Sequence, residues 1–195
     1  MSTELKPFSW ERMISAMEAV RERALRATKA LREAGVPHGI AGGNAVAAWV
    51  ARVDEAAVRN TRDVDILVRR ADFGRIQLAL ESVGFHYHQV MGVDRFIDGP
   101  DGSPSDAVYL LYAAEKVRPE YILPSADVTE IEPADDYDIV DLPALLTMKL
   151  NSYRRKDQMH LLDMLSVGLI DETWLEKLPP VHAERLQQLI SDPDG

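Results

Sequence analysis

The chain has 195 residues, of which 46% are hydrophobic and 28% charged, and its 32 acidic and 22 basic residues give a formal net charge of −10. This composition is typical of a globular protein with a hydrophobic core, and the excess of acid disfavours binding of an extended DNA backbone. The absence of cysteine excludes disulfides and thiolate metal sites. With no long apolar run and no secretion-signal pattern at the N-terminus, we expect a cytoplasmic protein without membrane association.

The N-terminal part is predicted to begin with a long amphipathic helix over residues 9 to 34, ended by Gly35 and Pro37. Its apolar positions recur near helical spacing: Met13, Met17, Val20, Ala24 and Leu31. A short apolar segment, 38 to 41, then leads through Gly42-Gly43 into an alanine-rich helix over 44 to 53. Alternating residues predict a strand over 63 to 68, and helical spacing predicts a helix over 72 to 82.

The remaining chain is predicted to hold strands first and helices last. Strands are expected at 85 to 90, 93 to 97 and 107 to 113, with weaker candidates at 128 to 131 and 139 to 140, and helices at 143 to 154, 157 to 167 and 180 to 190. This order predicts an α/β (α+β) fold with a mixed β-sheet flanked by helices. We expect three parts: an N-terminal amphipathic helix (1–35), a sheet core (36–142) and a C-terminal helical region packed on the core (143–195).

The most informative segment combines Gly42-Gly43 with Asp63-Val64-Asp65. Residues i and i+2 of a strand point to the same face, so Asp63 and Asp65 would present two carboxylates side by side, an arrangement that suits Mg²⁺. Glycines at a strand-to-helix turn let backbone N–H groups approach a phosphate. A plain turn and a solvated strand edge are the structural alternatives. The apolar residues around the acids indicate a largely buried strand instead, where unpaired carboxylates are costly.

In the order of these motifs the sequence resembles the nucleotidyltransferase superfamily, in particular the branch related to AbiEii-type toxins. The resemblance covers roughly residues 36 to 168 and implies a nucleotidyltransferase-like sheet in which Gly42 and Gly43, with Asn44 and Arg62, bind a nucleoside triphosphate. It also implies that Asp63 and Asp65 bind the catalytic Mg²⁺. Arg62 could instead neutralise Asp63.

A second match lies in the segment Met148-Lys149-Leu-Asn-Ser-Tyr-Arg154-Arg155-Lys156-Asp157. It resembles the family's C-terminal helical motif, which implies that Lys149 meets phosphate and that Asp157 stands near the acceptor or orients a base. From spacing alone, Lys149, Tyr153 and Lys156 would share one helix face. Two structural alternatives remain: Lys149 could snorkel between apolar neighbours, and Asp157 could cap the helix that follows.

The sequence departs from the family pattern at two positions. A third carboxylate is expected on the strand 107 to 113, but Tyr109 occupies its place, and Asp106 and Glu115 flank the strand. His160 stands where the toxin-like pattern favours an acid. A third acid commonly accepts a proton or bridges a second metal ion, so its replacement puts catalysis in doubt more than the fold.

The sequence therefore supports two main functions. The first is Mg²⁺-dependent transfer of a nucleoside monophosphate from an NTP to an acceptor hydroxyl on RNA, a protein or a small molecule. The resemblance adds a toxin role with an antitoxin protein as partner. The second is a catalytically silent nucleotide-binding or partner-binding module on the same fold, and a structural domain without a ligand is a third alternative.

Overall fold

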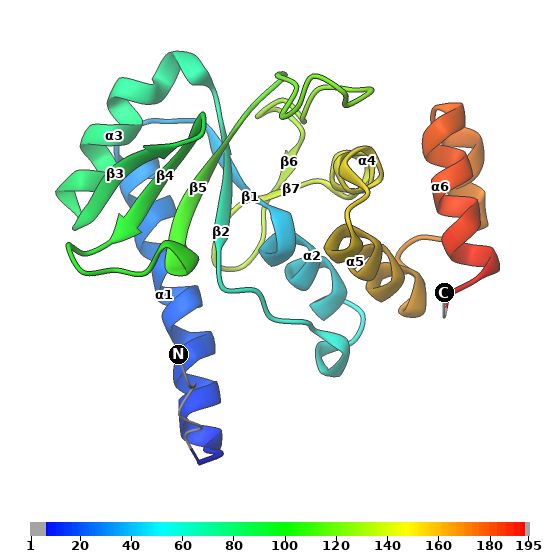
Figure 1. The fold of residues 1–195 in the computed structure, drawn as a ribbon, viewed down its shortest axis with the longest axis horizontal. Coiled ribbons are helices and arrows are strands. Elements are labelled where there is room, and N and C mark those ends of the chain that lie inside the picture. The colour runs from blue at the N-terminus through cyan, green and yellow to red at the C-terminus, as the bar shows by residue number, and fades with distance from the viewer. Residues whose placement is uncertain (1–6, 194–195) are drawn as a thin grey trace.

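The computed structural model describes residues 7–193. The start of the predicted first part (residues 1–6) and the end of the predicted third part (residues 194–195) lie outside the described residues. Seven strands form one sheet in the order β3-β4-β5-β2-β1-β7-β6 (Figure 1). The strands are β1 (His38–Ala41), β2 (Val64–Val68), β3 (Phe85–Val90), β4 (Val93–Asp98), β5 (Ala107–Tyr112), β6 (Ile131–Glu132) and β7 (Ile139–Val140). β2 pairs with β5, and β1 with β7, in parallel, whereas the other pairs are antiparallel. The predicted mixed α/β sheet is confirmed.

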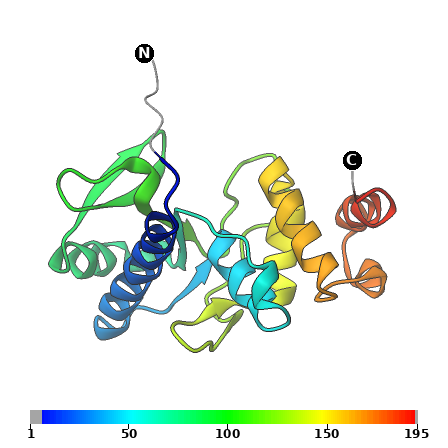
Figure 2. The ribbon, with the colours of Figure 1, turned by 90° about the horizontal axis from the view of Figure 1, so that it is seen from below.

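The helices are α1 (Trp10–Glu33), α2 (Gly42–Ala51), α3 (Phe73–Ser82), α4 (Leu142–Ser152), α5 (Arg155–Ser166) and α6 (Pro180–Ser191). A short 3₁₀ helix over Glu172–Lys177 was not predicted. Two boundaries differ in ways that affect function: α2 begins at the glycine pair itself, and α5 begins two residues before its predicted start. Figures 1 and 2 both show α4, α5 and α6 gathered at the end of the molecule away from α3, with α6 outermost.

The centre of the core is β2, which lies between β5 and β1. Val64, Ile66, Leu67 and Val68 are fully buried, so the strand is covered on both faces, as its near-continuous apolar sequence indicated. α5 packs on α2 and α4, which attaches the helical end of the molecule to the sheet through α2. Because β2 is held in place on both sides, a polar side chain on this strand also has a fixed position.

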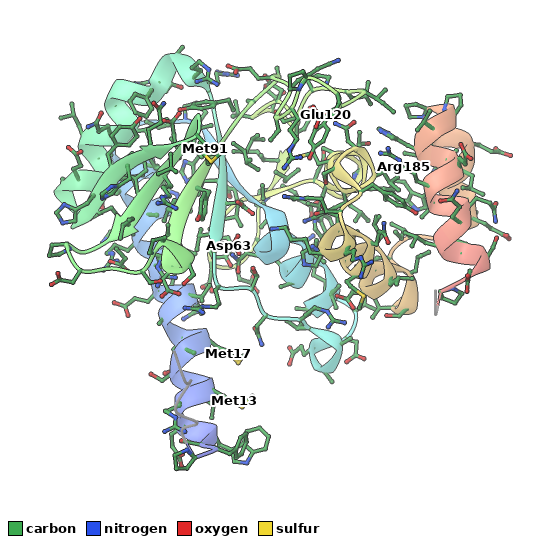
Figure 3. All side chains as sticks on the ribbon, viewed as in Figure 1. Met13, Met17, Asp63, Met91, Glu120 and Arg185 are labelled. Atoms are coloured by element: carbon green, nitrogen blue, oxygen red, sulfur yellow. The ribbon has the colours of Figure 1, made fainter. Side chains whose placement is uncertain are left out.

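Only the second half of α1 packs on the sheet. Ala24, Ala27 and Leu31 are buried, whereas the first half extends beyond the core (Figure 1). Met13 and Met17 belong to the predicted apolar face but project from this free half with 49% and 47% of their surface exposed (Figure 3). The helix is confirmed, but its apolar stripe is longer than the sheet surface that could cover it. None of the helices in the described chain combines the length and apolar character that a membrane span requires.

Asn151 joins α4 to the long segment that follows β5. Its Oδ1 accepts hydrogen bonds from the backbone N–H groups of Ile122 (3.0 Å) and Leu123 (3.2 Å), and its Nδ2 donates to the carbonyl of Leu123 (2.7 Å). The side chain is buried, so these backbone groups have no easy access to water. One amide side chain thus fixes an otherwise irregular segment.

We expect Asn151→Leu to lower the free energy of unfolding by about 2–3 kcal/mol, because it leaves backbone polar groups buried without partners. Urea denaturation measures the change. Gln187→Leu, at an exposed position of α6, makes the same exchange of an amide for an apolar side chain and should change stability by less than about 0.5 kcal/mol. Equal effects of the two variants would contradict the assigned role of Asn151.

Candidate functional site

The register of β1 on β2 brings the glycine pair to the acidic pair. Ala41 lies opposite Asp65, and Gly42 follows directly. Gly42 has a φ of 64°, and a Cβ added there would lie 1.9 Å from Oδ2 of Asp65. A Cβ on Gly43 would lie 2.9 Å from Cγ2 of Thr61. Both glycines are thus required by the close approach of α2 to the segment that enters β2, before any ligand is considered.

Asp63 is fixed just before β2 by two polar side chains. The Thr61 hydroxyl donates to its Oδ1 (2.7 Å), and Asn44 Nδ2 donates to its backbone carbonyl (2.8 Å). Burial opposes ionisation of Asp63, but the Thr61 hydrogen bond and the charge of Lys156 outweigh burial, so the pKa of Asp63 is lowered. Asp63 is therefore an ionised carboxylate, and Figure 3 shows it between β2 and α2.

The ionised form of Asp65 is stabilised less than that of Asp63. Its carboxylate accepts no hydrogen bond from the side chains or backbone of residues 7–193. Burial, and then repulsion from Asp63, raise the pKa of Asp65, whereas Lys149 and Lys156 lower it by smaller amounts. A cation placed next to both carboxylates would therefore stabilise the ionised form of Asp65.

The corner between α4 and α5 is built on Asp157. α4 ends at Tyr153, which has a φ of 47°, and the chain then turns into α5. Asp157 is fully buried and accepts hydrogen bonds from Ser152 Oγ (2.8 Å), Arg154 Nε (2.7 Å), the Arg154 backbone N–H (3.2 Å) and Lys149 Nζ (3.3 Å). Burial opposes its ionisation, but the hydrogen bond from Arg154 and the charge of Lys149 lower the pKa of Asp157 overall. Asp157 is the N3 residue of α5 and not its N-cap, but its side chain does cap the helix, because it accepts the backbone N–H of the N-cap residue Arg154.

Lys149 does not snorkel to solvent, because only 5% of its surface is exposed. Its Nζ lies 3.0 Å from Nδ1 of His160 and 3.3 Å from Asp157 Oδ1. Burial lowers the pKa of Lys149, and Asp157 and Asp65 oppose this shift. Burial and the charge of Lys149 lower the pKa of His160 to about 4. His160 is therefore neutral near pH 7, and its Nδ1 accepts a hydrogen bond from the Lys149 ammonium group.

These groups share a cavity of about 700 Å³ between β2, α2 and the α4–α5 corner. Met91, at the tip of the β3–β4 hairpin, belongs to its rim. The lining is rich in charge of both signs. Its acids are Asp63, Asp65 and Asp157, and its cations are Arg118, Lys149, Arg154 and Lys156. A cavity with paired carboxylates and several cations suits a phosphorylated ligand that carries a metal ion.

Six of the eight residues predicted for the site line this cavity: Gly42, Gly43, Asp63, Asp65, Lys149 and Asp157. Asn44 and Arg62 do not. Asn44 acts on the site indirectly, through its hydrogen bond to Asp63. The Arg62 side chain is exposed and paired with Asp106 (3.0 Å), so it neither reaches the cavity nor neutralises Asp63.

Of the basic residues that line the cavity, the prediction left out four: Arg118, Arg154, Lys156 and His160. The expectation that Lys149, Tyr153 and Lys156 share one helix face is wrong, because the chain leaves the helix at Tyr153. The Tyr153 hydroxyl instead donates to the backbone of Arg185 in α6 (3.0 Å). Lys156 approaches Asp63 because the corner turns it there. The adjacent basic residues of 154 to 156 were the sequence signal that could have found these side chains. Which way those side chains point depends on the turn at Tyr153.

Tyr109 lies opposite Asp65 on β5, at the position expected for a third acid. Its hydroxyl donates to the carbonyl of Pro104 (2.9 Å). Of the flanking acids, Asp106 is paired with Arg62, and Glu115 is paired with Arg70 (2.7 Å). Within residues 7–193, no three His, Cys, Asp or Glu side chains group as metal ligands. The described site thus offers two carboxylates where the family pattern has three.

The fold is similar to that of solved nucleotidyltransferases. The chain superposes on a crystal structure of ANT(2″)-Ia in complex with adenylyl-2″-tobramycin with a TM-score of 0.54 and 15% sequence identity, over 88% of this chain and 98% of that one. A protein from H. pylori assigned provisionally to the nucleotidyltransferases gives a TM-score of 0.52 and 16% identity, over 96% of this chain and 80% of that one. No protein-family model and no curated protein matches the sequence.

We expect Gly42→Ala to lower the free energy of unfolding by about 2 kcal/mol or more, since it combines a strained backbone with a clash against Asp65. Gly74→Ala is the matched control. Gly74 lies in α3 with open space around its Cβ position, so this change should stabilise the protein by about 0.5–1 kcal/mol. Denaturation curves of both variants provide the test, and a neutral Gly42→Ala would disprove the close contact.

Proposed function

We propose that this protein is a nucleotidyltransferase that transfers a nucleoside monophosphate from an NTP to an acceptor hydroxyl, with Mg²⁺ as its metal ion. One observation carries the proposal: the contact of Gly42 with Asp65, which lies in the same cavity as Asp63 and the buried Lys149. This cavity combines a glycine turn that suits phosphate, two carboxylates that suit a divalent ion, and a lysine. The nucleotidyltransferase fold supports the same conclusion.

The residues present fit Mg²⁺. Asp63 and Asp65 offer hard oxygen ligands from one strand, and the carboxylate of Asp65 is left without hydrogen-bond donors from the described chain. When bound, Mg²⁺ would neutralise phosphate charge and align the triphosphate. The ion would also remove the repulsion between the two carboxylates, so binding of metal and of nucleotide would support each other.

The protein's own groups would act around the triphosphate. The N-terminus of α2, at Gly42 and Gly43, has no side-chain cap, and its free backbone N–H groups would bind phosphate oxygens. Lys149 and Lys156 would offset the charge that develops on the phosphates. The acceptor oxygen bonds to the α-phosphorus, the bond to the leaving pyrophosphate breaks, and the acceptor proton passes to solvent or to a carboxylate. Asp157 would hold Lys149, because its oxygens already accept five hydrogen bonds.

The acceptor in this proposal is RNA, a protein side chain or a small molecule. The complex of ANT(2″)-Ia contains an adenylyl group joined to tobramycin, an aminoglycoside, and this supports a hydroxyl-bearing acceptor in general. The resemblance to AbiEii-type toxins adds a finer proposal, in which transfer arrests growth and an antitoxin protein opposes it. Growth arrest on expression that Asp65→Asn relieves would support this finer proposal, and unimpaired growth would contradict it.

The activity is tested by incubating the protein with each α-labelled NTP, Mg²⁺ and candidate acceptors. We expect label transfer by the wild type and at least a hundredfold less by Asp65→Asn, because the variant loses a metal ligand. The same variant should raise the free energy of unfolding by about 1 kcal/mol without Mg²⁺, since it removes an uncompensated carboxylate. Arg62→Gln, outside the cavity, is the control for transfer. Equal transfer by wild type and Asp65→Asn would refute the proposal.

The second candidate is a silent module that binds a nucleotide without transferring it. Tyr109 favours this candidate, because it stands opposite Asp65 where a third acid is expected. Binding of Mg²⁺ and a non-hydrolysable NTP by a wild type that transfers no label to any acceptor would identify it.

The role of position 109 is tested by comparing Tyr109→Asp with Tyr109→Asn. Three adjacent carboxylates repel one another, so we expect Tyr109→Asp to be less stable than Tyr109→Asn without metal and to gain more stability from added Mg²⁺ or Mn²⁺. It should also transfer label faster than Tyr109→Asn. Thermal unfolding at several metal concentrations measures the first effect. Identical metal responses would show that position 109 does not face the metal site.

A further inference from the structure

His160 occupies a position that the proposed reaction does not by itself explain. The Lys149 ammonium group has three N–H donors and is almost fully buried. Asp157 Oδ1 and His160 Nδ1 provide two acceptors, at 3.3 and 3.0 Å. These two contacts orient the nitrogen, and Asp65 on β2 attracts its charge from across the cavity. One N–H group is left for a ligand.

The charges around Lys149 show why a neutral acceptor matters. Asp157 carries one negative charge and contacts two cations, Lys149 and Arg154. The formal charge of this group is therefore +1. A carboxylate at position 160 would reduce it to zero while making a similar contact to Lys149. A neutral imidazole keeps the excess positive charge and still orients the ammonium group.

We propose that His160 is a positioning residue: its Nδ1 holds the Lys149 ammonium group toward the cavity and, as a neutral acceptor, leaves the charge of Lys149 available to a phosphate ligand. The second half of this statement rests on the proposed binding of a triphosphate in the cavity. The first half concerns only contacts within the protein. The two halves can therefore be tested separately.

Three substitutions separate geometry from charge. The Oδ1 atom of Asn or Asp occupies nearly the same place as Nδ1 of His, so His160→Asn keeps a neutral acceptor and His160→Asp makes the same acceptor negative. His160→Leu removes the acceptor. His86→Leu, on the exposed side of β3, is the control for loss of an imidazole.

Binding of Mg²⁺ and a non-hydrolysable NTP, measured by calorimetry, tests the role toward phosphate. We expect His160→Leu to bind about tenfold more weakly than the wild type, because Lys149 loses its orientation. His160→Asn should recover most of this affinity. His160→Asp should bind about tenfold more weakly than His160→Asn, although it is at least as stable, because the added charge competes with phosphate for Lys149. Equal affinities of the Asn and Asp variants would overturn this part of the proposal.

A double-mutant cycle in urea tests the contact without any nucleotide. We expect the effects of His160→Leu and Lys149→Met on the unfolding equilibrium constant to be non-additive by about a factor of ten. Additive effects would overturn the positioning role. A wild type that binds no nucleotide would refute the proposed function and the role toward phosphate, and the cycle would still decide whether His160 holds Lys149.

Discussion

The contact between Asp65 and Gly42 is the constraint on which the site depends. A carboxylate in the central strand of a buried sheet would normally be surrounded by donors, but here it abuts a position that only glycine can occupy. The same contact determines where α2 begins, and so where its free N–H groups point. The register between β1 and β2 thus has two consequences. It requires a glycine at position 42, and it places the repelling carboxylates of Asp63 and Asp65 beside that glycine turn.

The opposite wall depends on a carboxylate that, unlike the partly buried Asp65, is fully buried and accepts hydrogen bonds at both oxygens. Asp157 is surrounded by donors from Ser152, Arg154 and Lys149, and it closes the corner between two helices. Burying an ion is acceptable there because each oxygen has partners. The cavity therefore lies between a pair of adjacent carboxylates and a helical corner that carries an excess of cations. A metal ion with a polyphosphate would satisfy both walls together.

The sequence predicted the fold and most of the cavity because these depend on local patterns. The apolar run of β2 and the spacing of its acids follow from strand periodicity alone, and the glycine pair marks the adjacent turn. Arg62 and Lys156 were misjudged for two different reasons, a non-local contact for Arg62 and an unusual local turn for Lys156. The Arg62 side chain points toward its hydrogen-bond partner Asp106, which lies 44 residues away in the sequence. Lys156 follows the left-handed turn at Tyr153, a conformation that a tyrosine rarely adopts and that helical spacing cannot indicate.

Tyr109 and His160 lie on opposite walls of one cavity, at two positions where the pattern that the sequence resembles has acids, and their effects on charge add. Each replacement removes one negative charge, so the described lining keeps three acids and four cations. A lining of this charge binds an anionic ligand with fewer metal ions than one with five acids would need. Because a second metal ion commonly requires a bridging carboxylate, loss of the acid at 109 and retention of positive charge at Lys149 favour the same arrangement. In the proposed function, that arrangement would be one divalent ion beside Asp63 and Asp65, with lysines in place of a second ion.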